Sequence, residues 1–228
     1  MPTIATNLKK IHRQIQHAQQ LYAREKNAVQ LLAVSKTKPA SMIASAYQAG
    51  QRHFGENYLQ EALNKQRELG VYSITWHFIG AIQSNKTKLI ASHFDWVHCV
   101  DSVKIALRLS QQRPENLPPL NLCIQINISN EESKAGILLE ELPDLVTQIS
   151  SLPNLNLRGV MAIPAPESDF AKQREPFQKL VAAVNALKND TLTTFSFGMS
   201  DDLEAAIAEG STLVRIGTAL FGSRQSKN

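Results

Sequence analysis

The fold is decided by a short apolar run that ends in a polar pair, Leu31-Leu32-Ala33-Val34-Ser35-Lys36. A run of this length bounded by polar residues is a strand candidate. Side chains alternate along a strand, so Leu32, Val34 and Lys36 share one face. If Leu32 and Val34 point into a barrel, Lys36 points into its mouth.

Similar apolar runs recur through the chain and alternate with longer amphipathic segments. Strand candidates lie at 29–34, 52–54, 74–79, 96–100, 121–128, 155–163, 193–197 and 212–216. Helix candidates lie between them at 41–50, 58–69, 85–92, 103–112, 139–152, 170–188 and 201–209, and a further helical pattern at 4–24 precedes the first strand. This alternation indicates βαβ units and a parallel sheet. Eight such units favour a closed barrel over an open, doubly wound sheet.

The sequence therefore predicts an α/β protein, a TIM-type (β/α)8 barrel with an extra N-terminal helix. We expect residues 1–228 to form one domain, because no linker rich in Gly, Pro or Ser divides them. The chain is short for this fold, which leaves little room for insertions. We expect disorder only at 224–228.

Composition narrows the function classes. The net charge of +4 and the 19% of charged residues are ordinary for a soluble protein. No basic cluster interleaved with aromatics and no long run of like charge is present, so nucleic acid is not an expected partner. No glycine-rich GxGxxG loop follows a strand, which argues against a dinucleotide-binding fold.

The remaining signals favour a cytoplasmic protein without a metal. Cys99 and Cys123 form no CxxC pair, which favours a reducing compartment over a disulfide framework or a zinc site. The six histidines show no HExxH-like spacing. We expect no signal peptide, and no apolar stretch reaches the length of a membrane span, so no membrane association is expected.

In a barrel of this type the functional residues gather at the carboxyl ends of the strands. Lys36 lies at such an end, where partial burial would favour the neutral amine that Schiff-base chemistry requires. The alternative is that Lys36 is an ordinary solvent-exposed lysine just past a strand, a description that fits the nearby Lys38 well. Asn57 follows the second strand and either caps the next helix, contacts a ligand, or does both. His77 in the third strand is more typical of a packed core residue than of a catalyst.

The last two strands predict a phosphate site. Ser200 follows the seventh strand and is a good N-cap for the next helix. Gly217 and Thr218 follow the eighth strand, where this fold commonly holds a phosphate on backbone N–H groups and hydroxyls. Asp201 and Asp202 would repel a phosphate unless their side chains turn away.

Seven segments together resemble the pyridoxal phosphate homeostasis protein family, also called the proline synthase co-transcribed family. They are Ala33-Val34-Ser35-Lys36, Phe54-Gly55-Glu56-Asn57-Tyr58-Leu59-Gln60-Glu61, His77-Phe78-Ile79-Gly80 with Gln83-Ser84-Asn85-Lys86, Lys134-Ala135-Gly136, Arg158-Gly159-Val160-Met161, Gly198-Met199-Ser200-Asp201-Asp202 and Val214-Arg215-Ile216-Gly217-Thr218-Ala219-Leu220-Phe221-Gly222. They occur in the family's order and spacing and span nearly the whole chain.

The resemblance implies a barrel similar to the N-terminal domain of alanine racemase, with pyridoxal 5′-phosphate (PLP) bound as a Schiff base on Lys36. It implies that Arg215 faces the pyridine nitrogen of PLP. The pocket would be lined by Val34, Asn57, His77 and Met161, and the phosphate held by Ser200, Gly217 and Thr218.

The arginine has a chemical consequence. A guanidinium does not readily give up its proton, so it keeps the ring nitrogen unprotonated and the ring becomes a weaker electron sink. A racemase also needs a second acid/base, which in alanine racemases is a tyrosine from a second domain. We expect that domain to be absent here, because the chain ends shortly after the last predicted strand. Its four tyrosines lie in early segments, at Tyr22, Tyr47, Tyr58 and Tyr72.

Three functions remain open at this point. The first is a monomeric, non-catalytic protein that buffers or delivers PLP to apo-enzymes and so influences amino- and keto-acid metabolism. The second is a PLP-dependent amino-acid racemase with an unrecognised second base. The third is a phosphate-binding barrel enzyme without PLP, in which Lys36 acts as a base.

Overall fold

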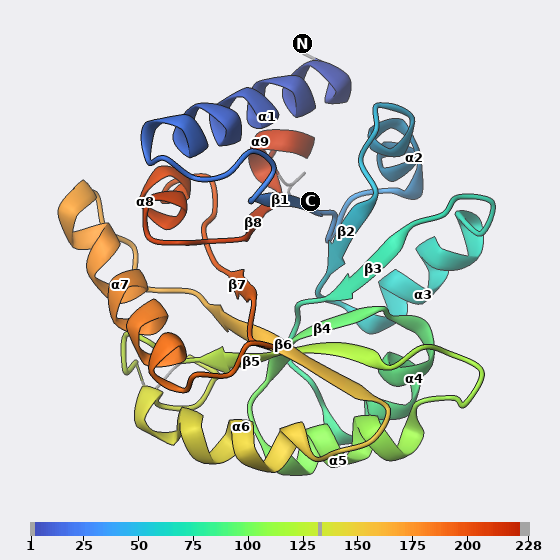
Figure 1. Ribbon diagram of the computed structural model, residues 1–228. Helices are drawn as coiled ribbons and strands as arrows, with labels where there is room; N and C mark the ends of the chain where they lie inside the picture. The colour runs from blue at the N-terminus through green and yellow to red at the C-terminus, as the bar shows by residue number, and fades with distance from the viewer. Residues whose placement is uncertain (1–2, 132–133, 224–228) are drawn as a thin grey trace.

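Eight parallel strands close into one barrel in the order of the sequence (Figure 1). The computed structural model describes residues 3–131 and 134–223. The strands are β1 Gln30–Val34, β2 His53–Glu56, β3 Thr75–Phe78, β4 Trp96–Val100, β5 Leu120–Ile126, β6 Leu155–Ala162, β7 Thr194–Ser196 and β8 Leu213–Ile216. Each pairs in parallel with its neighbours, and β1 also pairs with β8 to close the ring. The predicted fold class is confirmed.

Helices surround the barrel and connect its strands (Figure 1). They are α1 Ile4–Leu21, α2 Ala40–Gln48, α3 Leu59–Glu68, α4 Thr87–His93, α5 Val103–Gln112, α6 Leu142–Ser150, α7 Phe170–Ala186, α8 Leu203–Ala208 and α9 Thr218–Phe221, with single 3-10 turns η1 Ser84–Lys86 and η2 Leu139–Glu141. Across residues 3–131 and 134–223, no helix is both long and apolar enough to cross a membrane.

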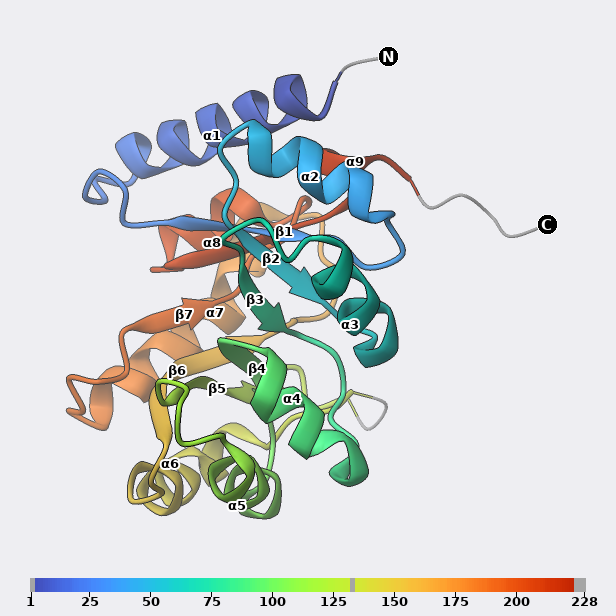
Figure 2. The ribbon, with the colours of Figure 1, turned by 90° about the vertical axis from the view of Figure 1, so that its right-hand side faces the viewer.

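The predicted N-terminal helix packs on the outside of the barrel. Its apolar residues Leu8, Ile11, Ile15 and Ala18 recur at helical spacing and are buried. Figure 2 shows α1 lying beside α2, α8 and α9, near the seam where the first and last strands meet. The helix ends at Leu21, three residues earlier than predicted, and the left-handed backbone of Ala23 (φ 50°) follows.

The predicted cap at Ser200 is wrong, and the structure excludes the capping alternative for Asn57. The N-cap of α8 is Asp202 and not Ser200, and the N-cap of α3 is Tyr58 and not Asn57. After β7 the chain turns at Gly198 (φ 97°), and the Met199 N–H donates to the Asp202 carboxylate, so the helix starts only after this turn. Ser200 is thereby left outside α8, and Asn57 lies before the cap residue of α3. The expectation of disorder at 224–228 lies outside the described residues.

The side chains of the first strand alternate as predicted. Leu31 and Ala33 belong to the apolar layer between strands and helices. Leu32 is fully buried on the opposite, inner face, where it approaches Gly55 of the neighbouring strand β2. This alternation carries Val34 and Lys36 toward the carboxyl mouth of the barrel.

Gly159 permits the close approach of β6 and β7. It pairs with Thr194, and a Cβ atom added at Gly159 would overlap the Thr194 carbonyl oxygen. We expect Gly159→Ala to lower the free energy of unfolding by about 3 kcal/mol, because backbone must move to make room. Denaturant unfolding measures this loss.

Gly70→Ala is the matched control for this substitution. The nearest atom to a Cβ at Gly70 lies 3.7 Å away, so no rearrangement is needed. Equal stability losses for the two variants would contradict the steric explanation.

Candidate functional site

A cavity of about 550 Å³ opens at the carboxyl ends of the strands. Its size is typical of a site for a small molecule. Eight of the nine predicted site residues line it, namely Val34, Lys36, Asn57, Met161, Ser200, Arg215, Gly217 and Thr218. Further lining residues that the sequence did not predict are Ile79, Ile163, Met199, Asp201 and Ala219. Residues from six different strands or their following loops therefore meet at one place.

His77, the ninth predicted residue, lies elsewhere. It is fully buried inside the barrel, and its ring nitrogens bond to His53 (3.0 Å) and His98 (2.9 Å). It is not among the residues that line the cavity. The physical reason is its place within β3, two residues before Ile79, which follows the strand's carboxyl end and reaches the cavity instead.

Arg215 is a buried cation at the floor of the cavity. Its guanidinium donates to the carbonyl of Ser196, to the Ser196 hydroxyl (3.0 Å) and to the carbonyl of Ala162 (2.9 Å). Within the described ranges 3–131 and 134–223, no carboxylate forms a salt bridge with it. Burial lowers the pKa of Arg215 to about 10, which still leaves it protonated at neutral pH. The site therefore presents a fixed positive donor to whatever occupies the cavity.

Asn57, which lines the same cavity, carries an unsatisfied acceptor. Its Oδ1 atom is buried without a hydrogen-bond partner among the described residues. A buried acceptor without a partner costs free energy, so such atoms are commonly satisfied by a ligand or water. The backbone of Asn57 is held close to Gly80, where a Cβ atom would overlap the Asn57 carbonyl. Only glycine at position 80 permits this approach.

The residues predicted to bind a phosphate also line the cavity. Gly217 lies against β1, because a Cβ there would stand 3.2 Å from the Val34 carbonyl oxygen. The hydroxyl residues Ser200 and Thr218 are exposed and line the cavity. They offer hydroxyl and backbone N–H donors to an anion.

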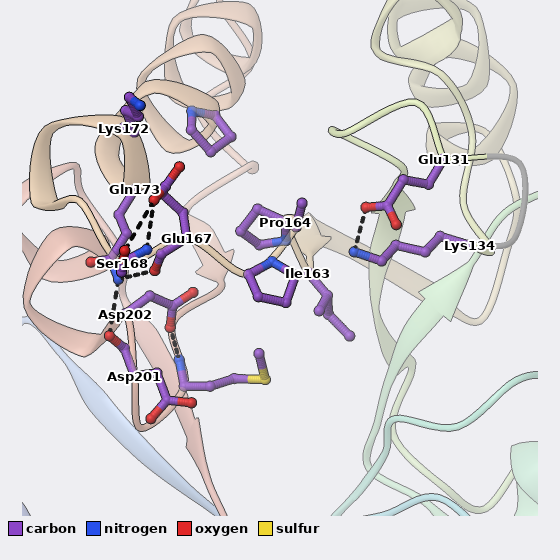
Figure 3. A pocket seen from close by; sticks show the side chains of 14 residues that line it. Glu131, Lys134, Ile163, Pro164, Glu167, Ser168, Lys172, Gln173, Asp201 and Asp202 are labelled. Atoms are coloured by element: carbon purple, nitrogen blue, oxygen red, sulfur yellow. Dashed lines mark hydrogen bonds and ion pairs between the residues drawn. The ribbon is translucent and has the colours of Figure 1, made fainter.

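The two acidic residues next to Ser200 behave differently. Asp202 turns back to accept from the Met199 N–H and lines a neighbouring cavity of about 720 Å³ (Figure 3). Asp201 is exposed and lines both cavities. On the far wall of the larger cavity Lys134 pairs with Glu131 at 2.7 Å (Figure 3). The Asp202 side chain thus turns away from the predicted phosphate site, as such a site requires. Asp201 still lines that cavity.

A buried ionic cluster holds the backbone on both sides of Lys36. The Lys65 ammonium bonds to the Ser35 carbonyl (2.8 Å), to Glu56 (2.8 Å) and to Glu61 (2.5 Å). The Ser35 hydroxyl donates to Glu56 (2.6 Å), and the Thr37 N–H donates to Glu61 (2.6 Å). We call Lys65, Glu56 and Glu61 the lysine brace.

The lysine brace also offsets local strain beside Lys36. Thr37 has a left-handed backbone (φ 63°), which is costly for a β-branched residue and is offset by its bond to Glu61. Burial raises the pKa of Glu56, and the Lys65 ammonium opposes that rise. The brace was not predicted from the sequence, although Glu61 and Lys65 stand at helical i,i+4 spacing.

The chain is similar to known proteins along almost its whole length. Residues 6–225 match the family model described as alanine racemase, N-terminal domain. A protein of Pseudomonas aeruginosa named pyridoxal phosphate homeostasis protein is 58% identical over 224 residues, which make up 98% of this chain and 97% of that protein. The Escherichia coli K12 protein of the same name is 55% identical over 229 residues, covering 98% of each chain.

The chain belongs to the pyridoxal phosphate homeostasis protein family. A solved structure of PipY from Synechococcus elongatus with PLP bound superposes with a TM-score of 0.82 at 38% identity, covering 96% of this chain and 100% of that one. Alanine racemase from Corynebacterium glutamicum superposes with a TM-score of 0.67 at 16% identity, over 94% of this chain and 62% of that one. The second likeness supports the shared barrel fold alone.

The lysine brace makes a prediction about stability. Lys65→Met removes the cation and leaves the fully buried Glu56 carboxylate without its partner, so we expect a loss of about 3 kcal/mol or more in the free energy of unfolding. Lys134→Met is the control, because the Lys134–Glu131 pair is partly exposed and should contribute at most about 1 kcal/mol. Denaturant unfolding measures the stability loss of each variant. Similar losses would contradict a stabilising role for the lysine brace.

Proposed function

We propose that this chain binds PLP as a Schiff base on Lys36 and takes part in intracellular PLP homeostasis and amino- and keto-acid balance, without catalysis of its own. The observation that carries the proposal is the meeting of Lys36, Asn57 and Arg215 in one cavity of suitable size. The names of the relatives and the PLP-bound PipY structure support it. The whole chain, residues 1–228, would act as a single cofactor-binding domain.

The residues of the cavity fit this cofactor. Arg215 is a buried donor without a carboxylate partner among the described residues, which suits a neutral aromatic nitrogen as acceptor. The unsatisfied Oδ1 of Asn57 can accept a bond from a ligand hydroxyl. Ser200, Gly217 and Thr218 offer the donors and the close backbone approach that a phosphate needs.

Each residue then has a distinct role. PLP supplies an aldehyde that condenses reversibly with amines and a ring that withdraws electrons. Lys36 provides the amine, and the lysine brace fixes the backbone on either side of it. Arg215 keeps the ring nitrogen unprotonated because it donates and does not readily give up its proton. This arrangement favours holding the cofactor over stabilising carbanions.

The positions of the tyrosines favour a binding role over racemisation. Of the residues that line the cavity within the described part of the chain, none is a tyrosine. Tyr22 bonds to Glu204 at 2.8 Å, Tyr47 packs on Tyr72, and Tyr58 is 52% exposed. A racemase similar to alanine racemase needs an acid/base opposite Lys36, and these side chains are engaged or directed elsewhere.

The proposed function also includes a compartment, an oligomeric state and recipients for the cofactor. We propose a cytoplasmic monomer that hands PLP to apo-enzymes. Two buried free cysteines, Cys99 and Cys123, are compatible with a reducing compartment. The exposed rim of the cavity, including Thr218 and Ser200, leaves a path for the cofactor to leave.

The attachment point is tested by chemical trapping. Borohydride treatment of the PLP-loaded protein should bleach its visible absorption, and peptide mass mapping should place the reduced adduct on Lys36. Lys36→Ala should abolish the adduct and retain weak, phosphate-anchored binding. Lys38→Ala is the matched control, since Lys38 bonds to the Gly222 and Ser223 carbonyls and should not affect trapping. An adduct that persists in Lys36→Ala would refute the assignment.

The absence of catalysis is tested separately. We expect the PLP-loaded protein to leave the α-protons of the twenty amino acids unexchanged in deuterated solvent, as followed by proton NMR. The control is an alanine racemase under the same conditions. Exchange that is lost in Lys36→Ala would make the racemase-like enzyme the better description.

A further inference from the structure

A line of polar side chains crosses the interior of the barrel and ends at Arg215. The Arg215 guanidinium contacts the Ser196 hydroxyl (3.0 Å), and that hydroxyl contacts His98 Nδ1 (2.8 Å). His98 Nε2 lies 2.9 Å from His77 Nδ1, and His77 Nε2 lies 3.0 Å from His53 Nδ1. Four consecutive hydrogen bonds therefore join Arg215 to His53, the first residue of β2.

This line runs from one end of the barrel to the other. Arg215 lines the cavity at the carboxyl ends of the strands, whereas His53 lies at the amino end of its strand and is half-buried. Ser196, His77 and His98 are fully buried between them. Trp96 stacks on His77 with ring centroids 5.5 Å apart and an interplanar angle of 11°, which holds the middle ring in place.

The proton positions along the line follow from its Arg215 end. A guanidinium has donors and no acceptor, so the Ser196 hydroxyl oxygen must accept from Arg215. Among the described residues, the acceptor in reach of the Ser196 hydroxyl hydrogen is His98 Nδ1. A neutral histidine that accepts at Nδ1 donates at Nε2. His98 therefore donates to His77, and His77 in turn donates to His53.

We propose that Ser196 and His98 are positioning residues for Arg215, and that with His77 and His53 they form one directed hydrogen-bonded chain whose direction Arg215 sets. The directed chain follows from the protein's own contacts. Its effect on PLP rests on the function proposed above and deepens it, because the directed chain orients the group that faces the ring nitrogen.

The charge state of the rings agrees with this direction. Burial, reinforced by the nearby Arg215 charge, lowers the pKa of His98 to about 3. Burial also lowers the pKa of His77 well below its ordinary value, and the pKa of His53 to a lesser degree, with Asp95 opposing the change at His53. Neutral rings can each accept at one nitrogen and donate at the other, as the directed chain requires.

The directed chain leaves Arg215 oriented for a ligand. Of the five guanidinium N–H groups, those that bond to Ser196 and Ala162 are fixed, so at least two are not used by these partners. Fixing a long side chain before a ligand arrives removes part of the entropy cost of binding. A loose guanidinium would offer the same charge without the same direction.

The direction of the hydrogen bonds is tested on the protein without cofactor. Long-range ¹H–¹⁵N NMR of the histidine side chains should find Nδ1 unprotonated and Nε2 protonated in His98 and His77. Couplings across the hydrogen bonds should link each Nε2–H to Nδ1 of the next ring. A proton on Nδ1 of His98 would overturn the proposal. This measurement stands whether or not PLP binds.

Variants test the positioning role. His98→Leu removes the acceptor for Ser196, whereas His98→Asn keeps one near the Nδ1 position. In His98→Leu we expect freer rotation of the Arg215 guanidinium by NMR, a shifted visible band of bound PLP, and a roughly fivefold to tenfold weaker PLP affinity, the scale of one lost hydrogen bond. His98→Asn should restore all three readouts toward the wild type.

Ser110→Ala is the control for general destabilisation. Ser110 is a buried serine on α5 whose hydroxyl bonds to the Pro153 carbonyl, away from the directed chain. Ser196→Ala should change the His53 ring resonances as well as the PLP band, and Ser110→Ala should change neither. If Arg215 rotation in His98→Leu matches that in Ser110→Ala, the positioning role is wrong. If Arg215 responds as expected but neither the wild type nor any variant binds PLP, the directed chain stands and the proposed function fails.

Discussion

The pairing of the first and last strands is the contact on which the site depends. β1 and β8 pair from Gln30 with Leu213 to Ala33 with Ile216, and this pairing closes the sheet into a barrel. It brings Lys36, just beyond β1, and Gly217, just beyond β8, into the lining of one cavity. Bringing together β1 and β8, which lie far apart in the sequence, costs conformational entropy that only the completed contacts offset. The site therefore forms only when the whole barrel is complete.

The interior of the barrel is unusual for its fold. Barrels of this type fill their interior mainly with branched apolar side chains. Here Leu32 fills part of it, and three residues of the directed chain, Ser196, His77 and His98, fill another part. A buried polar network stabilises a structure only when every member has its partners, and Ser196, His98 and His77 each have them along the line that starts at Arg215. The cation at the site and the polar interior therefore require each other.

The barrel could be predicted from the sequence because its evidence is periodic, and the cavity residues because they stand at strand ends in segments shared with a family. Ser200 was wrongly predicted as a helix cap, since a turn at Gly198 delays the helix and no local propensity reveals that turn. Glu56 and Lys65 look like ordinary surface charges in the sequence, and only the packing of α3 against the end of β1 buries them together. The histidines of the directed chain meet through strand register, which a pattern read along one chain does not contain.

The lysine brace and the directed chain divide the work of preparing one cavity. The brace holds the backbone on both sides of Lys36, and the directed chain holds the guanidinium of Arg215. Both use buried hydrogen bonds to charged groups. Such bonds are stronger than those between neutral groups, and removing one partner costs more free energy. A ligand that enters therefore meets donors and acceptors already in place, and its binding energy is not spent on ordering them. Under the proposed function, reversible retention of the PLP aldehyde would need this rigidity more than a second acid/base, because condensation with Lys36 would require alignment and not proton abstraction from carbon.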